Sequence, residues 1–229
     1  MVSESEMIPI RIKFTKTGNL VYISHLDLQK TMQKIIVRSG IDIWYSEGFN
    51  PQPKISFATP LPIGVESECE FLDLRLNSDQ DLNEIKDNLQ NNFPSEMKVL
   101  KVYKPTTKIK DLVYYEYEIK IHALNVESTI PDKINDLFSK DVFVTKKSKD
   151  KEKQINISEY IESIDAQIQS DGDILIHTIL FSNSEKNLNP ELLIEALRNE
   201  YGILCTSLID EYYSIKRIRA LNANKKEFE

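Results

Sequence analysis

The hydrophobic pattern of the chain switches between a period of two residues and a helical period, and it does so in a similar order twice. Apolar residues at every second position indicate half-buried strands, and apolar residues three or four apart indicate amphipathic helices. The first half predicts a strand at 7–14, a helix at 24–40, strands at 54–58 and 69–76, a helix at 78–93 and a strand at 97–104. The second half predicts a strand at 112–123, a helix at 127–140, strands at 141–147 and 173–181, a helix at 189–202 and a strand at 207–221.

Both halves therefore follow the order β-α-β-β-α-β, which is typical of ferredoxin-like folds. We predict an α+β protein made of two tandem ferredoxin-like units, at 7–104 and 112–221, joined by a short linker. Two further short strands are expected at 20–24 and 41–46, whereas 154–168 is compatible with an extended or a helical conformation. The prediction concerns the order of elements, because the two halves share no repeat of residues.

Composition excludes several classes of protein. The 229 residues are 41% hydrophobic and 28% charged, as in ordinary globular proteins, and no apolar run is long enough to span a membrane. The start has no basic region followed by an apolar stretch, so we expect no secretory signal and a cytoplasmic protein. Two distant cysteines, Cys69 and Cys205, supply neither a disulfide framework nor the ligands of an iron–sulfur cluster. Motifs for metals, nucleotides and dinucleotides are absent, so we expect no cofactor and no metal site.

The charge is unevenly distributed. A net charge of −7 argues against broad, nonspecific binding to nucleic acids. Residues 11–58, however, contain seven Lys or Arg against three acidic residues, so this segment is basic within an acidic chain. A site for an anionic partner would therefore lie in this segment.

The predicted helix at 24–40 begins with "SHLD". Ser24 and Asp27 have the spacing of a capping box, which satisfies free N–H groups at a helix start. Capping does not require His25, which would lie near the positive end of the helix dipole, where a neutral imidazole is favoured. His25 is therefore either a base, hydrogen-bond donor or ligand, or a histidine at the edge of the core.

Further along the same helix Lys30, Lys34 and Arg38 recur every fourth residue and so share one face. The stripe is either a solvated surface or a contact for phosphates or an acidic partner.

The stretch "YSEGFNPQPKISFATPLPIG" at 45–64 concentrates prolines, glycines and aromatic rings. Its prolines restrict the backbone, so the loop is expected to be stiff. Phe49, Asn50, Gln52 and Lys54 offer a ring, two amides and an ammonium, which suit an unpaired base or a protein partner. The alternative is a rigid connection whose aromatic residues are buried.

The motifs "ISHLDL", "YSEGFNPQPK" and "LPIGVES" within residues 11–76 resemble those of the radical SAM-linked protein family. Members of this family have no known function and are fused to, or encoded beside, B12-binding radical SAM proteins. The family usually has "NPHPK", where this chain has Gln52 in place of the histidine; His25, Asp27, Asn50 and Lys54 match. The predicted order of elements is also similar to that of tandem ferredoxin-like RNA-processing proteins of the Cas6 type.

The resemblance implies an accessory or substrate-binding module that is not catalytic on its own and works with a radical SAM protein, with structured RNA as a candidate substrate. One alternative is a metal-independent RNA endonuclease, with His25 as general acid or base and Lys54 stabilising the transition state. Another is a scaffold that binds only proteins. The candidate binding residues are His25, Asp27, Lys30, Lys34, Arg38, Phe49, Asn50, Gln52 and Lys54.

Overall fold

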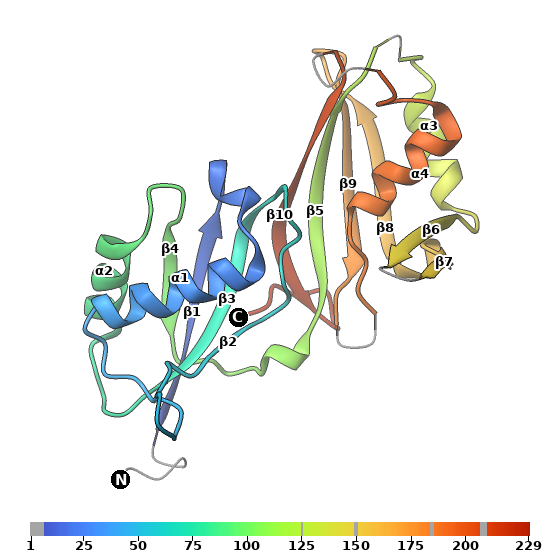
Figure 1. The fold of residues 1–229 in the computed structure, drawn as a ribbon. Helices are drawn as coiled ribbons and strands as arrows, with labels where there is room; N and C mark the ends of the chain where they lie inside the picture. The colour runs from blue at the N-terminus through green and yellow to red at the C-terminus, as the bar shows by residue number, and fades with distance from the viewer. Residues whose placement is uncertain (1–6, 125, 149–150, 184–185, 207–209) are drawn as a thin grey trace. The chain divides into compact units, whose positions relative to one another are not determined.

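The computed structural model describes residues 7–124, 126–148, 151–183, 186–206 and 210–229. It is a mixed α/β structure, and the described residues form four α-helices (Figure 1). The chain divides into two compact units, Met1–Asp111 together with Phe228–Glu229, and Leu112–Glu227. The last two residues thus belong to the first unit, which the pattern of periodicity does not predict.

The first unit contains an antiparallel sheet in the order β4-β1-β3, with β2 on the remaining edge of β3. Each strand runs opposite to its neighbour, and Ile10 and Ile55 both pair with Leu74 from the two sides of β3. In chain order the elements are β1 (Ile8–Lys16), the 3₁₀ helix η1 (Gly18–Tyr22), α1 (His25–Arg38), β2 (Ile55–Phe57), β3 (Val65–Leu76), α2 (Leu82–Asn92), β4 (Val99–Tyr103) and the 3₁₀ helix η2 (Ile109–Asp111).

Both helices of this unit cover the same face of the sheet. Because side chains alternate along a strand, Ile10, Ile12 and Phe14 of β1 all point toward the helices. They form one core with Leu72, Leu74 and Leu76 of β3 and with the apolar faces of α1 and α2, Leu28, Met32, Ile35, Ile36, Ile85 and Leu89. The intervening residues therefore lie on the helix-free face, and they include Pro9, Arg11, Asp73 and Arg75.

The predicted start of α1 is confirmed. The Ser24 hydroxyl accepts a hydrogen bond from the Asp27 N–H at 3.1 Å and donates one to the Asp27 carboxylate at 2.7 Å. The reciprocal bond of the predicted capping box thus uses the hydroxyl rather than the backbone N–H of Ser24. At the other end Gly40 has φ +66°, the left-handed conformation that glycine adopts after a helix.

Two predicted strands of this unit are wrong. Residues 20–24 belong mostly to η1, because Leu20, Val21 and Ile23 all turn toward the core, which a strand with alternating sides would not allow. In 41–46 only Ile43 and Tyr45 make isolated bridges, to Leu76 and Pro53. A proline has no N–H to donate, so the pairing around it stays short.

The second unit contains an antiparallel sheet in the order β10-β5-β9-β8, together with a separate hairpin of β6 and β7. In chain order the elements are β5 (Leu112–His122), α3 (Ile130–Phe138), β6 (Phe143–Ser148), β7 (Lys151–Asn156), the 3₁₀ helix η3 (Ser158–Tyr160), β8 (Ile161–Ile168), β9 (Ile174–Phe181), α4 (Glu191–Tyr201) and β10 (Tyr212–Asn222). The strand predicted at 141–147 thus pairs in the hairpin rather than in the larger sheet.

The strand that precedes β9 in the larger sheet is β8, from the segment 154–168 whose pattern left two interpretations open. That segment supplies the end of β7, then η3, then β8. The last predicted strand began at Ser207; residues 207–209 lie outside the described residues, and β10 begins at Tyr212. The predicted end of α4 is confirmed, since Gly202 has φ +65°. The helix begins at Glu191 with Pro190 as its N-cap, later than the predicted start at Asn189, although the Asn189 side chain accepts a bond from the Glu191 N–H.

We expect the second unit to lose stability at alkaline pH because of Tyr213. Burial, together with the bond of 2.7 Å that its hydroxyl donates to Glu191, raises its pKa to about 12. The folded state therefore holds this proton more tightly than the unfolded state, whose tyrosines titrate near about 10. The stabilisation should be complete below about pH 10 and lost as the pH rises toward 12.

Tyr213→Phe should flatten part of this loss, measured as the change in the urea midpoint by circular dichroism between about pH 9 and about pH 11.5. Part of the loss of stability at alkaline pH should remain in this variant, because burial raises the pKa of Tyr103 to about 12 as well. An unchanged alkaline slope in Tyr213→Phe would contradict the assignment.

Candidate binding grooves beside the 44–54 hairpin

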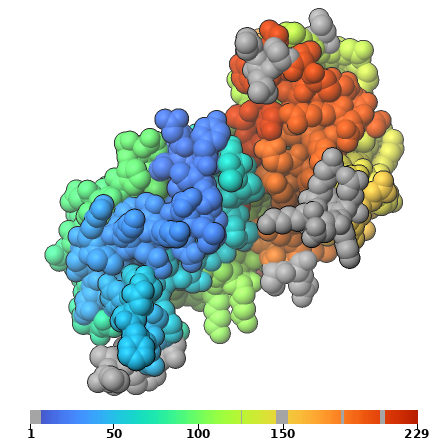
Figure 2. All heavy atoms as spheres, in the orientation of Figure 1, coloured from blue at the N-terminus to red at the C-terminus, as the bar shows by residue number. Residues whose placement is uncertain are grey.

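The proline-rich loop folds back on itself as a small hairpin. Lys54 donates its backbone N–H to the carbonyl of Trp44, and Ser46 donates to the carbonyl of Gln52. Figure 2 shows the atoms of this hairpin projecting from the surface beside those of α1. Phe49 at its tip is fully exposed, with a relative accessibility of 112%. The interpretation of Phe49 as a buried ring is therefore wrong, because the hairpin ends before the chain reaches the core.

A first groove lies between this hairpin and α1, and we call it the basic groove. It has a volume of about 380 Å³ and is lined by Lys30, Gln33, Lys34, Val37, Arg38, Gln52 and Pro53. The cationic stripe of α1 thus meets the loop at Gln52, although the two are separated in sequence.

All three cations of the basic groove are exposed. Within the described residues, no acidic side chain forms an ion pair with Lys30, Lys34 or Arg38. Their charges are therefore available to a partner. At the hairpin tip, Asn50 accepts a bond of 3.2 Å from the side chain of Gln52, which holds the two predicted amides together.

His25 and Asp27 line neither of the grooves described here. The His25 ring packs edge-on against Phe57 with 5.3 Å between the ring centres, and it is partly buried. The carboxylate of Asp27 is held by Ser24 at the helix start. The contacts of both residues thus belong to the structure of the unit itself, and their roles in binding stay predictions.

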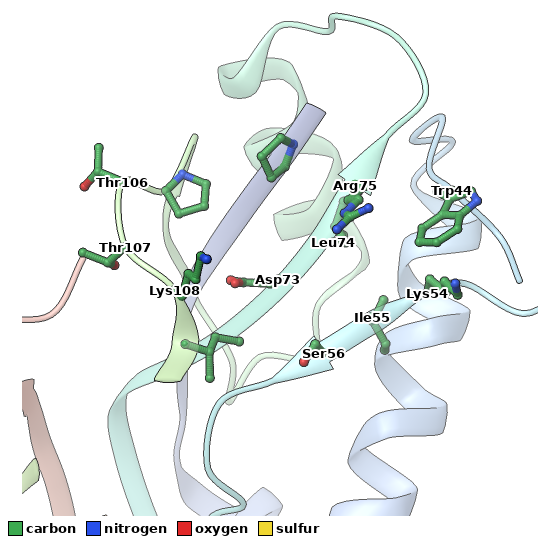
Figure 3. A pocket seen from close by; sticks show the side chains of 13 residues that line it. Trp44, Lys54, Ile55, Ser56, Asp73, Leu74, Arg75, Thr106, Thr107 and Lys108 are labelled. Carbon is green, nitrogen blue, oxygen red and sulfur yellow. The ribbon is translucent and has the colours of Figure 1, made fainter. Parts of the chain in front are cut away.

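A second groove opens on the helix-free face of the sheet, and we call it the Trp44 groove. It has a volume of about 640 Å³. Figure 3 shows Trp44, Lys54 and Arg75 at one end, residues 106–108 at the other, and Asp73 between them. The groove is lined by Pro9, Trp44, Lys54, Ile55, Ser56, Asp73, Leu74, Arg75 and residues 105–109.

Cations gather around the indole ring of Trp44. The Lys54 ammonium lies 3.5 Å from the ring centre, and the Arg75 guanidinium lies 5.4 Å from it. Lys54 therefore lies at the Trp44 groove, whereas Gln52 and Pro53, just before it, line the basic groove. The candidate residues of the loop divide between two surfaces.

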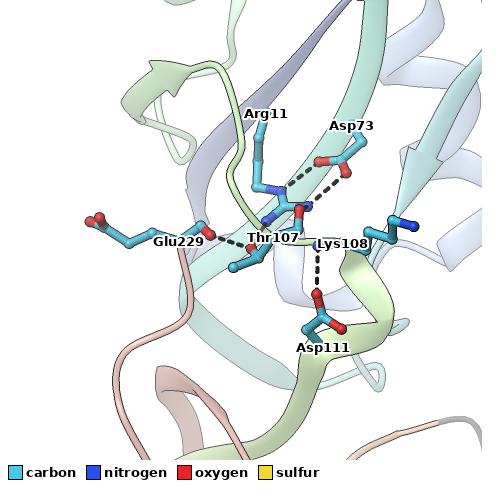
Figure 4. A network of polar contacts seen from close by, with 6 residues as sticks. All are labelled: Arg11, Asp73, Thr107, Lys108, Asp111 and Glu229. Atoms are coloured by element: carbon cyan, nitrogen blue, oxygen red, sulfur yellow. Dashed lines mark hydrogen bonds and ion pairs between the residues drawn. The ribbon is translucent and has the colours of Figure 1, made fainter.

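The acidic residue of the Trp44 groove is neutralised by a buried arginine (Figure 4). Asp73 accepts two hydrogen bonds from Arg11, at 2.7 and 2.8 Å, and the Arg11 side chain has an exposed fraction of 0%. Burial alone would lower the pKa of Arg11, but the bond and the charge of Asp73 raise it. The guanidinium therefore stays charged, and Lys54, Arg75 and Lys108 give the groove a positive balance.

The segment predicted as a linker closes this network. Arg11 donates to the Thr107 hydroxyl at 3.0 Å and to the Thr107 carbonyl at 3.1 Å. The Thr107 hydroxyl in turn donates to the carbonyl of Glu229, and the Lys108 N–H donates to Asp111 at 2.8 Å. The segment is thus fixed against the sheet and forms one wall of the Trp44 groove.

Sequence reasoning missed Trp44, Arg75 and Lys108 as site residues. Trp44 carries one available signal, since it is the single tryptophan of the chain. Arg75 lies at a polar position of an alternating strand and Lys108 in an apparent linker, and neither pattern predicts a groove. Three segments distant in sequence form this surface.

Two further features of the described residues bear on the chemistry. No three His, Cys, Asp or Glu side chains among them are grouped so that they could hold a metal ion. No helix that the structure describes is both long and apolar enough to cross a membrane.

Residues 9–190 match the model of a protein family described as "Uncharacterized protein conserved in bacteria (DUF2344)". The chain belongs to this family. The match includes both grooves and most of the second unit. Among curated proteins, no sequence matches the chain.

The chain is similar to chains of solved complexes at low sequence identity. A chain of the Cbf5-Nop10-Gar1 complex has a TM-score of 0.49 and 11% identity, over 92% of this chain and 48% of its own length. A chain of the archaeal box H/ACA sRNP Nop10-Cbf5 complex has a TM-score of 0.47 and 10% identity, over 95% of this chain and 49% of its own. The chain thus spans about half the length of the structures that it matches. At these scores the similarity bears on neither function nor site.

Proposed function

We propose that this protein is an accessory module that binds RNA through the basic groove and presents it to a radical SAM protein. The observation that carries the proposal is the set of three exposed cations, Lys30, Lys34 and Arg38, on one face of α1 without acidic partners among the described residues. Their spacing of four residues repeats about every 6 Å along the helix, close to the separation of successive phosphates in an RNA strand.

The neighbouring hairpin supports RNA rather than a simple anion. Phe49 presents an exposed ring and Asn50 and Gln52 present amides beside the cations, and rings with amides can stack on and hydrogen-bond unpaired bases. The basic groove would hold the backbone of the RNA, and the hairpin tip would contact a base.

The radical SAM protein as partner rests on the resemblance of residues 11–76. The module would orient the substrate, and the hard chemistry would come from the cofactor of the partner. In this proposal the protein works in the cytoplasm and supplies no catalytic residue of its own.

We further propose that the two units are ferredoxin-like domains, at 7–104 and 112–221. The strands of the first sheet lie in the order β4-β1-β3-β2, and those of the second in the order β10-β5-β9-β8. In both sheets the fourth strand along the chain is therefore followed by the first, the third and the second. This strand order supports the predicted topology, with the β6–β7 hairpin as an insertion in the second domain.

Replacing Lys30, Lys34 and Arg38 together by glutamine should weaken binding to structured RNA. Three lost phosphate contacts should reduce the slope of log K against log salt by about 2 and lower affinity about 100-fold near 0.1 M salt. Fluorescence anisotropy of a labelled RNA hairpin with single-stranded flanks, measured at several salt concentrations, gives both quantities.

The matched control replaces Lys86, Lys98 and Lys153 by glutamine, which removes the same charge from positions that line neither groove. The control should lose less than about threefold in affinity and keep the slope. Equal losses in the two triple variants would mean that only net charge matters, and an unchanged slope in the first would overturn the proposed role of the basic groove.

The same purified protein and RNA also distinguish the two alternative functions, an RNA endonuclease and a protein scaffold. An endonuclease would cleave the RNA in EDTA and lose this activity in His25→Ala. A protein scaffold would show no RNA binding at any salt concentration and would still capture a radical SAM protein.

A further inference from the structure

The Trp44 groove combines an aromatic ring, positive charge and hydroxyl groups on an otherwise apolar floor. Trp44 supplies the ring, Lys54 and Arg75 lie over it, and Lys108 stands at the far end. The chain brings these residues together from the hairpin, from β3 and from the segment before η2, so the groove is a product of the fold.

We propose that the Trp44 groove binds an unpaired nucleotide, with its base against the Trp44 indole and its phosphate near Lys108. This inference rests on the proposed function, since the nucleotide would belong to the RNA that the basic groove holds. The Trp44 groove would add a second contact with the RNA, on the other side of the hairpin. This contact would recognise a base, whereas the basic groove would hold the RNA backbone.

The electrostatics favour a phosphate-bearing ligand. The acidic side chain in the lining, Asp73, is already bonded twice by the buried guanidinium of Arg11. Lys54 and Lys108 therefore face the groove without an equal negative charge from the lining. A purely apolar ligand would leave these cations without new contacts, and a lone phosphate would leave the ring without one.

The indole ring favours a planar group over a flexible acidic side chain. An ammonium at 3.5 Å and a guanidinium at 5.4 Å show that the ring attracts cations in the free protein. A base stacking on Trp44 takes the place of the Lys54 ammonium, which then turns to the phosphate. The Lys54 side chain is exposed and can make this movement.

The dimensions suit a nucleotide within a chain. A volume of about 640 Å³ lies within the range of small-molecule sites, about 300 to 1,000 Å³. Ser56 and Thr106 line the groove with hydroxyls that can bond the edge of a base.

The test uses Trp44 as its own probe, because it is the single tryptophan. The full chain is titrated with a single-stranded RNA of about 12 nucleotides, and Trp44 emission is followed beside the anisotropy of labelled RNA. Stacking should quench the emission over the same concentration range in which anisotropy rises. Separate titrations with AMP, adenosine and inorganic phosphate then show whether the groove binds a free nucleotide as well as an RNA strand. They also show whether the nucleoside or the phosphate alone is sufficient for binding.

Trp44→Ala should weaken RNA binding about 10-fold or more by anisotropy, and Trp44→Phe should recover part of the loss. The control Phe143→Ala removes an exposed ring of the second unit and should change little. Lys108→Gln should reduce the salt slope by about 0.7, whereas Lys110→Gln, an exposed neighbour that does not line the groove, should not.

The outcomes are distinct from those of the basic groove. RNA binding with unchanged Trp44 emission and full affinity in Trp44→Ala would overturn this inference and leave the proposed function standing. Absence of RNA binding, with saturable quenching by AMP that Lys108→Gln weakens, would overturn the proposed function and support a site for a free nucleotide. Absence of any response to RNA or AMP would overturn both, and equal quenching by phosphate alone would overturn the contact with the base.

Discussion

Phe228→Ala should lower the free energy of unfolding of the first unit by about 3 to 5 kcal/mol, the usual cost of removing a buried phenylalanine ring. Phe228 has an exposed fraction of 1%, and its ring packs edge-on against Phe71 with 5.2 Å between the centres. The Arg11 guanidinium lies 4.6 Å from the same ring. The substitution thus removes an apolar cover from the helix-free face and opens a path for water to a buried charge.

Trp44 emission in a urea titration reports on the first unit alone, because the second unit contains no tryptophan. The control is Phe49→Ala, which removes the same ring from a fully exposed position of the same unit and should change stability by less than about 0.5 kcal/mol. Similar shifts in the two variants would show that Phe228 does not complete this core.

Asp73→Ala should also destabilise the first unit strongly, by about 3 to 5 kcal/mol, because it leaves a buried guanidinium without its counter-charge. Arg11 loses both of its bonds to the carboxylate and keeps its bonds to Thr107. The double variant Arg11→Met, Asp73→Ala should recover much of the loss, since the uncompensated charge is then gone.

The control for this prediction is Asp79→Ala, which removes an exposed carboxylate paired with Lys104 at 3.1 Å. A surface pair contributes about 0 to 1 kcal/mol, so the same Trp44 titration should show little change. If the double variant were less stable than Asp73→Ala, the buried charge would not be the cause of the loss.

Local pattern predicted most of the helices and strands. The helix at His25–Arg38 follows from apolar residues at helical spacing and from Ser24 and Asp27, whose bonds form within one turn. Where the pattern failed, a long-range contact decided the conformation. Leu20, Val21 and Ile23 turn together toward the core, and the strand pairing of the segment 41–46 is limited to the bridges from Ile43 to Leu76 and from Tyr45 to Pro53.

The candidate site was predictable only in part. The cationic face of α1 could be read from the spacing of Lys30, Lys34 and Arg38, because a helix places every fourth residue on one side. That Gln52 would join this face, while Lys54 would lie over Trp44, depends on how the hairpin folds back, which no spacing encodes.

The sequence by itself thus determined most of the helices and strands and the basic character of residues 11–58, since each depends on residues close together in the chain. Only the tertiary structure decided that Trp44, Arg75 and Lys108 share a groove and that Phe228 covers Arg11. These contacts join residues far apart in sequence, and they form because burying apolar area and pairing a buried charge stabilise the folded unit, whatever the distance along the chain.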